Sequence, residues 1–235
     1  MKLLALQHDD YDDAGSIIEW AIRNNHSLDT VLLTKGGKLP SSLDFDILFI
    51  MGGTMNVYEE YKFPWLAEEK VFIKKTVDAG KIAIGFCLGG QLLAVALGGK
   101  VTGNTELEAG WRIVNFNKTA QEHPVLSVFG KNAVIFQWHS DTFSVLPENA
   151  LLVASNDACA HHGFIYGNKV YAFQFHLELT YQMAYYFARE LEKGGEKGMF
   201  VQSGEKIRKQ HKHIKTNNKL MFDLLDRLAS NNFVK

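Results

Sequence analysis

Apolar residues in the N-terminal part of the chain form short runs separated by amphipathic segments. Runs rich in branched side chains, as expected of buried β-strands, occur at 2–7, 28–33, 46–51 and 81–86. Between them, apolar residues recur at helical spacing at about 13–24 and 64–79. This alternation predicts an α/β fold of the flavodoxin-like type, with a mostly parallel central sheet and flanking helices.

The pattern changes after residue 100. Strand-like runs, separated by turn residues and little helix, follow one another at 110–116, 133–138, 150–155, 162–166 and 169–175. Successive strands without intervening helices favour antiparallel pairing. The central sheet is therefore expected to have an antiparallel extension.

Two helical patterns end the chain, at 181–192 and 205–228. Many basic residues lie in the second, which suggests a contact with nucleic acid or a membrane. However, an apolar stripe of Leu220, Leu224, Leu225 and Leu228 favours a docked helix with a solvated basic face. We expect residues 1–190 to form one α/β domain and residues 191–235 to form a helical extension packed on it.

Composition favours an ordinary globular enzyme. The 235 residues carry a net charge of −1 and are 46% hydrophobic, which is enough for one sizeable core and gives no special affinity for polyanions. The start of the chain reads as a strand and lacks the features of a signal peptide, and no apolar run has the length of a membrane span. We expect a cytoplasmic protein without nucleic-acid or membrane partners.

A cysteine follows directly on the apolar run at 81–86. Glycines lie two residues before and two residues after Cys87, at Gly85 and Gly89. A nucleophile at the tip of a sharp strand-to-helix turn needs a strained backbone, and small neighbours let the chain pass close to it. The N-terminus of the following helix favours a thiolate and leaves backbone N–H groups free for an anion. We interpret Cys87 as an activated nucleophile rather than a buried structural thiol.

A histidine and a glutamate supply the groups that such a nucleophile needs. His176 and Glu178 follow the strand predicted at 169–175 and, at strand spacing, point to the same side. A base that takes the thiol proton needs a carboxylate to fix its tautomer and to stabilise the imidazolium. The sequence thus predicts a catalytic triad of Cys87, His176 and Glu178.

These residues resemble the class I glutamine amidotransferases, whose pattern is a G-x-C-x-G-x-Q elbow followed much later by an H-x-E pair. Gln91 occupies the position of the glutamine in the elbow. Further matches follow in order: the strand and glycine turn at 46–55, the Glu108-Ala-Gly-Trp111 segment, and residues 136–143. The resemblance covers about residues 40–190 and implies a stand-alone member similar to the glutaminase domain of GMP synthase.

The resemblance also implies roles for residues around the nucleophile. It assigns the oxyanion hole to the backbone N–H groups of Gly53 and Leu88. It assigns substrate contacts to Gly52, Gln91, Trp138 and His139. Neither a metal nor an organic cofactor is expected.

Two segments depart from the family pattern. Leu177 stands where many members have proline, but the residues on either side are unchanged. Ala160 and His162 replace a proline and a glutamine, which leaves room for a difference on the substrate side. The nearby Cys159, His161 and His162 lack a second pair of ligands at zinc-site spacing, which disfavours a structural zinc. We expect Cys159 to be packed and inert.

The predicted reaction is hydrolysis of the γ-amide of glutamine, or of a γ-glutamyl compound, through a γ-glutamyl thioester on Cys87. The ammonia would be released for transfer, and its possible acceptor is a separate synthetase partner. Three alternatives stay open: a γ-glutamyl peptide hydrolase without an acceptor, a non-catalytic regulatory module, and a cysteine-dependent ester or lactone hydrolase. The last is disfavoured because in α/β-hydrolases the acid precedes the histidine, whereas Glu178 follows His176.

Overall fold

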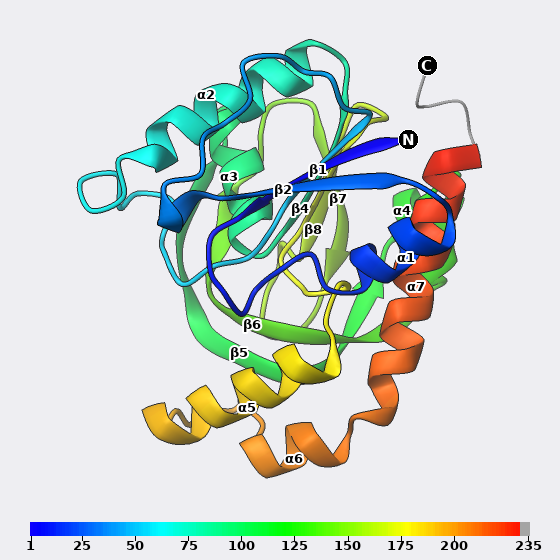
Figure 1. The fold of residues 1–235 in the computed structure, drawn as a ribbon. Coiled ribbons are helices and arrows are strands. Elements are labelled where there is room, and N and C mark those ends of the chain that lie inside the picture. The colour runs from blue at the N-terminus through cyan, green and yellow to red at the C-terminus, as the bar shows by residue number, and fades with distance from the viewer. Residues whose placement is uncertain (231–235) are drawn as a thin grey trace.

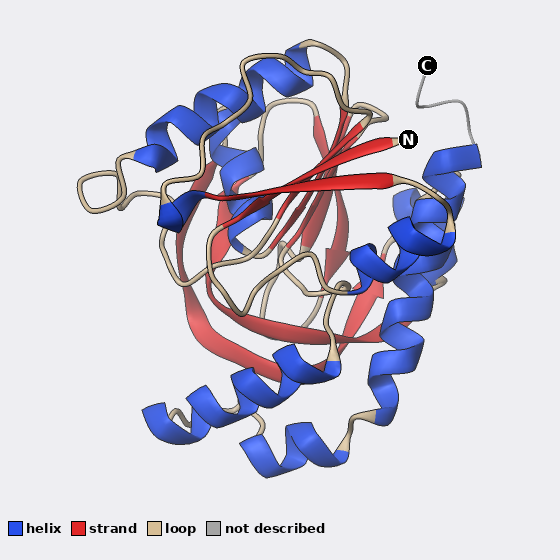
Figure 2. Ribbon diagram, in the orientation of Figure 1, coloured by secondary structure: helices blue, strands red, loops and turns tan. Residues whose placement is uncertain are grey.

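Figures 1 and 2 show the computed structural model, which describes residues 1–230. A nine-stranded sheet in the order β2-β1-β3-β4-β9-β8-β7-β5-β6 runs between helices. The strands are β1 (Lys2–Gln7), β2 (Ser27–Leu32), β3 (Ile47–Ile50), β4 (Ile82–Phe86), β5 (Lys100–Phe116), β6 (Asn132–Val145), β7 (Ala150–Ser155), β8 (Gly163–Tyr166) and β9 (Val170–Phe173). The helices are α1 (Ser16–Arg23), α2 (Trp65–Asp78), α3 (Leu88–Ala96), α4 (Lys118–Glu122), α5 (Tyr181–Gly194), α6 (Gly204–Lys209) and α7 (Lys212–Ser230). Short 3₁₀-helices occupy Leu33–Lys35 and Leu126–Phe129.

The predicted parallel core is confirmed for β2, β1, β3 and β4. Strand β9, which was expected only in the antiparallel extension, also pairs in parallel with β4. Side chains alternate between the two faces of these strands. In β3, Ile47 and Phe49 belong to the core that includes α1 and α7, whereas Leu48 and Ile50 belong to the core that includes α2 and α3. All four are fully buried, and burial of each large apolar side chain contributes about 1.5–3 kcal/mol. The continuous apolar run at 46–51 therefore reflects a strand covered on both faces.

The predicted antiparallel extension is also confirmed, in β9, β8, β7, β5 and β6. Its main feature is the long antiparallel pair of β5 and β6, which curves around one side of the molecule in Figure 1. The predicted strands at 110–116 and 133–138 cover only parts of these two strands. The N-terminal half of β5 was missed because most of it is exposed and its register with β6 shifts between Gly103 and Glu108.

The chain after β9 forms three helices rather than the two predicted. The expected helix at 205–228 is interrupted between α6 and α7, and the boundary expected after residue 190 falls within α5. Helix α7 runs beside α1 in Figure 1, and Nε1 of Trp20 donates to Asp226 at 2.7 Å. As predicted, the face of α7 containing Leu224 and Leu228 is buried. Among residues 1–230, no helix has the length and apolar composition needed to cross a lipid bilayer.

Candidate active site

Cys87 lies between β4 and α3, at the carboxyl end of the parallel strands. Its φ of 49° and ψ of −111° are unusual for a residue with a side chain, and its backbone N–H donates to the carbonyl of Phe173 at 2.8 Å. A Cβ at Gly89 would overlap the carbonyl oxygen of Ile50, and one at Gly85 would overlap the backbone of Gly89. Both glycines are thus required by close backbone approach, and the strained elbow has the form expected from the sequence.

His176 and Glu178 lie beyond the end of β9. The strand predicted to reach residue 175 ends at Phe173, but the backbone N–H of His176 still donates to the carbonyl of Phe136 on β6 at 3.0 Å. Nδ1 of His176 is 2.7 Å from Oε1 of Glu178, and both side chains are buried. A carboxylate at this nitrogen fixes the tautomer that leaves Nε2 available to accept a proton.

The thiol of Cys87 lies close to this imidazole. Sγ donates to the carbonyl of Trp138 at 3.4 Å, and Nε2 of His176 has no hydrogen-bond partner among the described residues. Burial opposes the charged ring, but Glu178, Asp12 and the Cys87 thiol raise the pKa of His176 well above its ordinary value. The arrangement therefore favours an imidazolium next to the sulfur.

A second carboxyl group, Asp12, approaches the same histidine. Its Oδ1 is 3.9 Å from Nδ1 of His176 and has no hydrogen-bond partner in the described chain. Burial raises the pKa of Asp12 to about 7, with the charge of His176 acting in the opposite direction. Asp12 is therefore a group near the imidazole that changes its charge near neutral pH.

The backbone of the histidine segment is held from two sides. Nδ2 of Asn217 on α7 donates to the carbonyls of His176 and Leu177, both at 2.9 Å. The N–H of Ser16, at the start of α1, donates to the carbonyl of Glu178 at 2.8 Å. The C-terminal helix thus contacts the segment that carries two of the predicted triad residues.

A pocket of about 230 Å³ opens above the elbow. The predicted site residues that line it are Cys87, Gly53, Leu88, Gln91, Trp138 and His139. His176, Glu178 and Gly52 are not among its lining residues. Gly52 instead packs against Asp12 and His176, where an added Cβ would lie 3.0 Å from Cε1 of the imidazole. The sequence did not identify Asp141, a carboxylate that lines the same pocket and accepts a hydrogen bond from Tyr58 at 3.1 Å.

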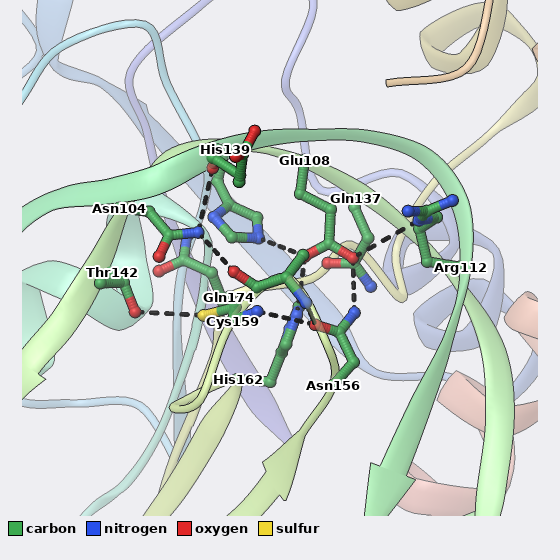
Figure 3. A network of polar contacts seen from close by, with 12 residues as sticks. Asn104, Glu108, Arg112, Gln137, His139, Thr142, Asn156, Cys159, His162 and Gln174 are labelled. Atoms are coloured by element: carbon green, nitrogen blue, oxygen red, sulfur yellow. Dashed lines mark hydrogen bonds and ion pairs between the residues drawn. The ribbon is translucent and has the colours of Figure 1, made fainter. Parts of the chain in front are cut away.

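A buried polar network supports the β6 side of the pocket (Figure 3). Oε2 of Glu108 is 3.1 Å from Nε2 of His139 and 2.8 Å from Nε2 of His162, and Oε1 accepts from Asn156 at 2.5 Å. Burial opposes ionisation of Glu108, but hydrogen bonds from the two histidines hold the pKa of this carboxyl well below its usual range. Burial also lowers the pKa of His162. His162 does not line the pocket, so its place in the structure is next to Glu108 rather than at the pocket surface.

Cys159 belongs to the same region and is packed, as expected. Its Sγ is 3.1 Å from the hydroxyl of Thr142, and burial raises the pKa of the thiol. One potential metal-ligand atom from each of His139, Cys159 and His162 lies within 4.8 Å of the others, as is also true of Asp12, His176 and Glu178. In the first set both Nε2 atoms already contact Glu108, and in the second Glu178 contacts the imidazole.

Comparison with protein families places this chain in a known group. The family model for glutamine amidotransferase class-I matches residues 13–193. The chain belongs to this family. It is 30% identical to the glutamine amidotransferase-like protein YfeJ of Salmonella typhimurium, over 77% of each chain. It is 27% identical to a glutamine-hydrolysing GMP synthase subunit of Thermoplasma volcanium, over 74% of this chain and 82% of that one. The crystal structure of a glutamine amidotransferase from Thermotoga maritima superposes with a TM-score of 0.87 at 28% identity, over 98% of both chains.

Two residues of this class I amidotransferase chain that contact the predicted triad were not identified from the sequence. Asp12 lies among several acidic residues at 9–13, and nothing in that pattern distinguishes the buried one. Asn217 did offer a signal, because it lies at helical spacing from the buried apolar residues of α7, Ile214, Met221 and Leu224. A polar residue on an apolar stripe predicts a specific buried hydrogen bond.

Proposed function

We propose that the protein hydrolyses the γ-amide of glutamine and releases ammonia, with Cys87 as nucleophile, His176 as base and acid, and Glu178 as the group that orients His176. The observation that carries this proposal is the strained cysteine of the elbow, which borders a pocket and lies next to the imidazole of His176. Nε2 of this imidazole has no hydrogen-bond partner in the part of the chain that the structure describes. Membership of the class I glutamine amidotransferase family supports the same reaction.

In the first half-reaction, the proton of the Cys87 thiol moves to Nε2 of His176. The sulfur then attacks the side-chain carbonyl carbon of glutamine, and the carbonyl oxygen becomes an oxyanion. Gly53 and Leu88 line the pocket beside Cys87, and their backbone N–H groups are the proposed donors to this oxyanion. Collapse of the intermediate breaks the C–N bond, and ammonia leaves with the proton from His176. A γ-glutamyl thioester remains on Cys87.

In the second half-reaction, a water molecule takes the place of ammonia. His176 accepts a proton from this water, and the resulting hydroxide attacks the thioester carbonyl. Collapse of the second intermediate breaks the C–S bond, releases glutamate and returns the proton from His176 to the sulfur. The contact between Glu178 and Nδ1 of His176 stabilises the imidazolium in both halves.

The pocket offers groups suited to the amino-acid end of the substrate. Asp141 provides a carboxylate that is only 7% exposed, and a charge of this sign matches the α-ammonium group of glutamine. Trp138, His139 and Gln91 form other parts of the lining. We propose that these residues hold glutamine with its amide over Cys87.

A separate protein chain is the proposed acceptor of the ammonia. The relative from Thermoplasma volcanium is named as one subunit of a GMP synthase, which supports a partner of the synthetase class. Ammonia that escapes into water is protonated and loses its nucleophilicity. A partner would therefore be expected to cover the mouth of the pocket.

The test is to incubate the purified protein with L-glutamine and, separately, with a γ-glutamyl peptide. Glutamate release is followed together with the mass added at Cys87. We expect turnover of glutamine and a trappable adduct on Cys87 in the wild type. Cys87→Ala should abolish both, whereas Cys159→Ala serves as a control in which the second thiol is removed and the adduct persists.

The other outcomes identify the alternatives. Cleavage of the peptide without release of ammonia from glutamine would indicate a γ-glutamyl peptide hydrolase. The absence of both turnover and adduct, with a correctly folded wild type, would indicate a non-catalytic module. Substantial turnover by Cys87→Ala would refute the assignment of the nucleophile.

A further inference from the structure

His8 and Glu69 form a fully buried pair outside the residues that line the pocket. His8 follows β1 directly, and Glu69 lies on α2. Nε2 of His8 is 2.8 Å from Oε1 of Glu69, and both side chains have no exposed surface. The imidazole also stacks on the indole of Trp65, with 5.6 Å between ring centroids. Because a buried ion pair often adds no stability relative to an apolar pair, stability alone is a weak reason for these residues.

The second ring nitrogen of His8 contacts the glycine turn. Nδ1 is 2.9 Å from the carbonyl oxygen of Gly52. A carbonyl oxygen can only accept a hydrogen bond, so Nδ1 of His8 donates to Gly52, and the carboxylate of Glu69 accepts from Nε2 when both ring nitrogens carry a proton. Burial opposes this charged ring, but Glu69 raises the pKa of His8, with further contributions from the Gly52 carbonyl and from Asp12. These contacts favour the imidazolium form of His8, and they hold its Nδ1–H against the Gly52 carbonyl.

The carbonyl of Gly52 and the N–H of Gly53 belong to the same peptide group. This peptide is trans, so its C=O and N–H point in opposite directions. Because neither glycine has a Cβ, this peptide can rotate at low cost. Neighbouring side chains also come so close to Gly53 that no larger residue fits there. A Cβ on Gly53 would lie 2.8 Å from Cβ of His8 and 2.9 Å from Cδ2 of Leu88. A donor on the carbonyl side therefore selects one of the orientations open to the Gly52–Gly53 peptide.

We propose that His8, held by Glu69, is a positioning residue that fixes the Gly52–Gly53 peptide with its N–H directed to the oxyanion formed on Cys87. This role rests on the proposed function, in which Gly53 supplies one of the two oxyanion donors. The hydrogen bond from a cationic ring also polarises the peptide and strengthens its N–H as a donor. Neither His8 nor Glu69 needs to contact the substrate.

The test compares two double variants that leave no unpaired buried charge. His8→Leu with Glu69→Met removes the donor to Gly52, whereas His8→Asn with Glu69→Gln places an amide N–H near the position of Nδ1. For glutamine hydrolysis, we expect the Leu/Met variant to lose on the order of 10²-fold in kcat with a nearly unchanged KM. We expect the Asn/Gln variant to recover most of this loss.

A second measurement separates the positioning role from general damage to the site. Alkylation of Cys87 by iodoacetamide needs the thiolate but passes through no oxyanion, so its rate should be similar in the wild type and in both double variants. Parallel loss of alkylation and turnover would overturn the proposal, and so would equal losses of kcat in the two double variants. If the Leu/Met variant does not fold, His8→Gln with Glu69→Gln replaces it, because a glutamine amide extends toward the position of Nε2 and leaves Gly52 without its donor.

The wild type in the same assay distinguishes this proposal from the proposed function. An active wild type with an equally active Leu/Met variant would overturn the positioning role alone. An inactive wild type would overturn both, because there would be no oxyanion for the peptide to bind. Loss of kcat with retained KM and retained alkylation is the combined result that supports the role of His8.

Discussion

The two walls of the pocket are held in place by different kinds of interaction. On the wall formed by the parallel strands, Cys87 is positioned by backbone hydrogen bonds and by close contacts that leave no room for a Cβ at Gly89. On the wall formed by β6, His139 is positioned by a buried carboxylate, Glu108, which also binds His162. The first wall depends on steric fit and the second on charge and hydrogen bonding.

This difference predicts different responses to substitution. Steric overlap with backbone atoms cannot be relieved by a change of rotamer, so changes on the first wall should affect the fold and activity together. A polar network can lose one member and keep its shape, at the cost of an unsatisfied buried group. Because this network contains titratable side chains, changes on the second wall should alter stability in a pH-dependent manner.

The largest expected effect is that of Gly89→Ala. The added Cβ would overlap the carbonyl oxygen of Ile50, so either the elbow or β3 must move. We expect a loss of more than about 4 kcal/mol in the free energy of unfolding, measured by urea denaturation. A stable and active Gly89→Ala protein would show that the first wall is not fixed by steric fit.

Gly103→Ala is the matched control for this substitution. Gly103 lies on β5, and an added Cβ would meet no atom within 4 Å. Its stability should stay within about 0.5 kcal/mol of the wild type, as for other surface changes. The comparison separates the steric effect at the elbow from a general effect of replacing glycine.

The sequence was sufficient to predict the first wall because its constraints are local. The apolar runs at 46–51 and 81–86 indicated buried strands, and glycines around Cys87 indicated the elbow. The second wall depends on contacts between distant segments. Glu108 receives hydrogen bonds from His139, Asn156 and His162, and no local pattern indicates that these side chains meet. The N-terminal half of β5 was missed for a different reason, since most of its residues are exposed and do not alternate.

Glu108→Gln tests the charged network of the second wall. Removing the charge leaves His139 and His162 facing a weaker acceptor, and we expect a loss of about 3 kcal/mol in unfolding free energy at pH 7. The pKa of Glu108 is lower in the folded protein than in the unfolded chain. Its contribution is therefore complete above the unfolded pKa of about 4.3 and is lost as the pH falls below it.

The pH dependence provides the measurement for this prediction. Wild-type stability should decrease as the pH falls below about 5 and should continue to decrease below pH 3, because the folded pKa of Glu108 lies far below the unfolded one, and Glu108→Gln should reduce that decrease. Glu106→Gln is the control, because Glu106 is exposed two residues earlier on the same strand. Equal pH dependence in all three proteins would mean that Glu108 does not carry the charge of this network.

Asn217→Ala should have a smaller effect, because it removes hydrogen bonds without removing a charge. The carbonyls of His176 and Leu177 would lose their donor from α7. We expect a loss of about 2 kcal/mol in stability and a reduced kcat, measured by thermal unfolding and glutamate release. Thr216→Ala, at an exposed neighbouring position, should change neither. An unaltered kcat in Asn217→Ala would show that His176 is held in position without the hydrogen bonds from the C-terminal helix.

Asp12→Asn should have the smallest effect, visible mainly in a pH profile. Asp12 loses its proton near pH 7, and its negative charge then favours the imidazolium of His176, 3.9 Å away. The rate of Cys87 alkylation by iodoacetamide should therefore rise through pH 7 in the wild type by more than thiol ionisation alone predicts. In Asp12→Asn this additional rise should be absent. The alkylation rate of the variant should be similar to that of the wild type at pH 6 and up to about tenfold lower at pH 8. An additional rise of equal size in both proteins would mean that a group other than Asp12 causes it. The charge of His176 would then be stabilised by Glu178 alone.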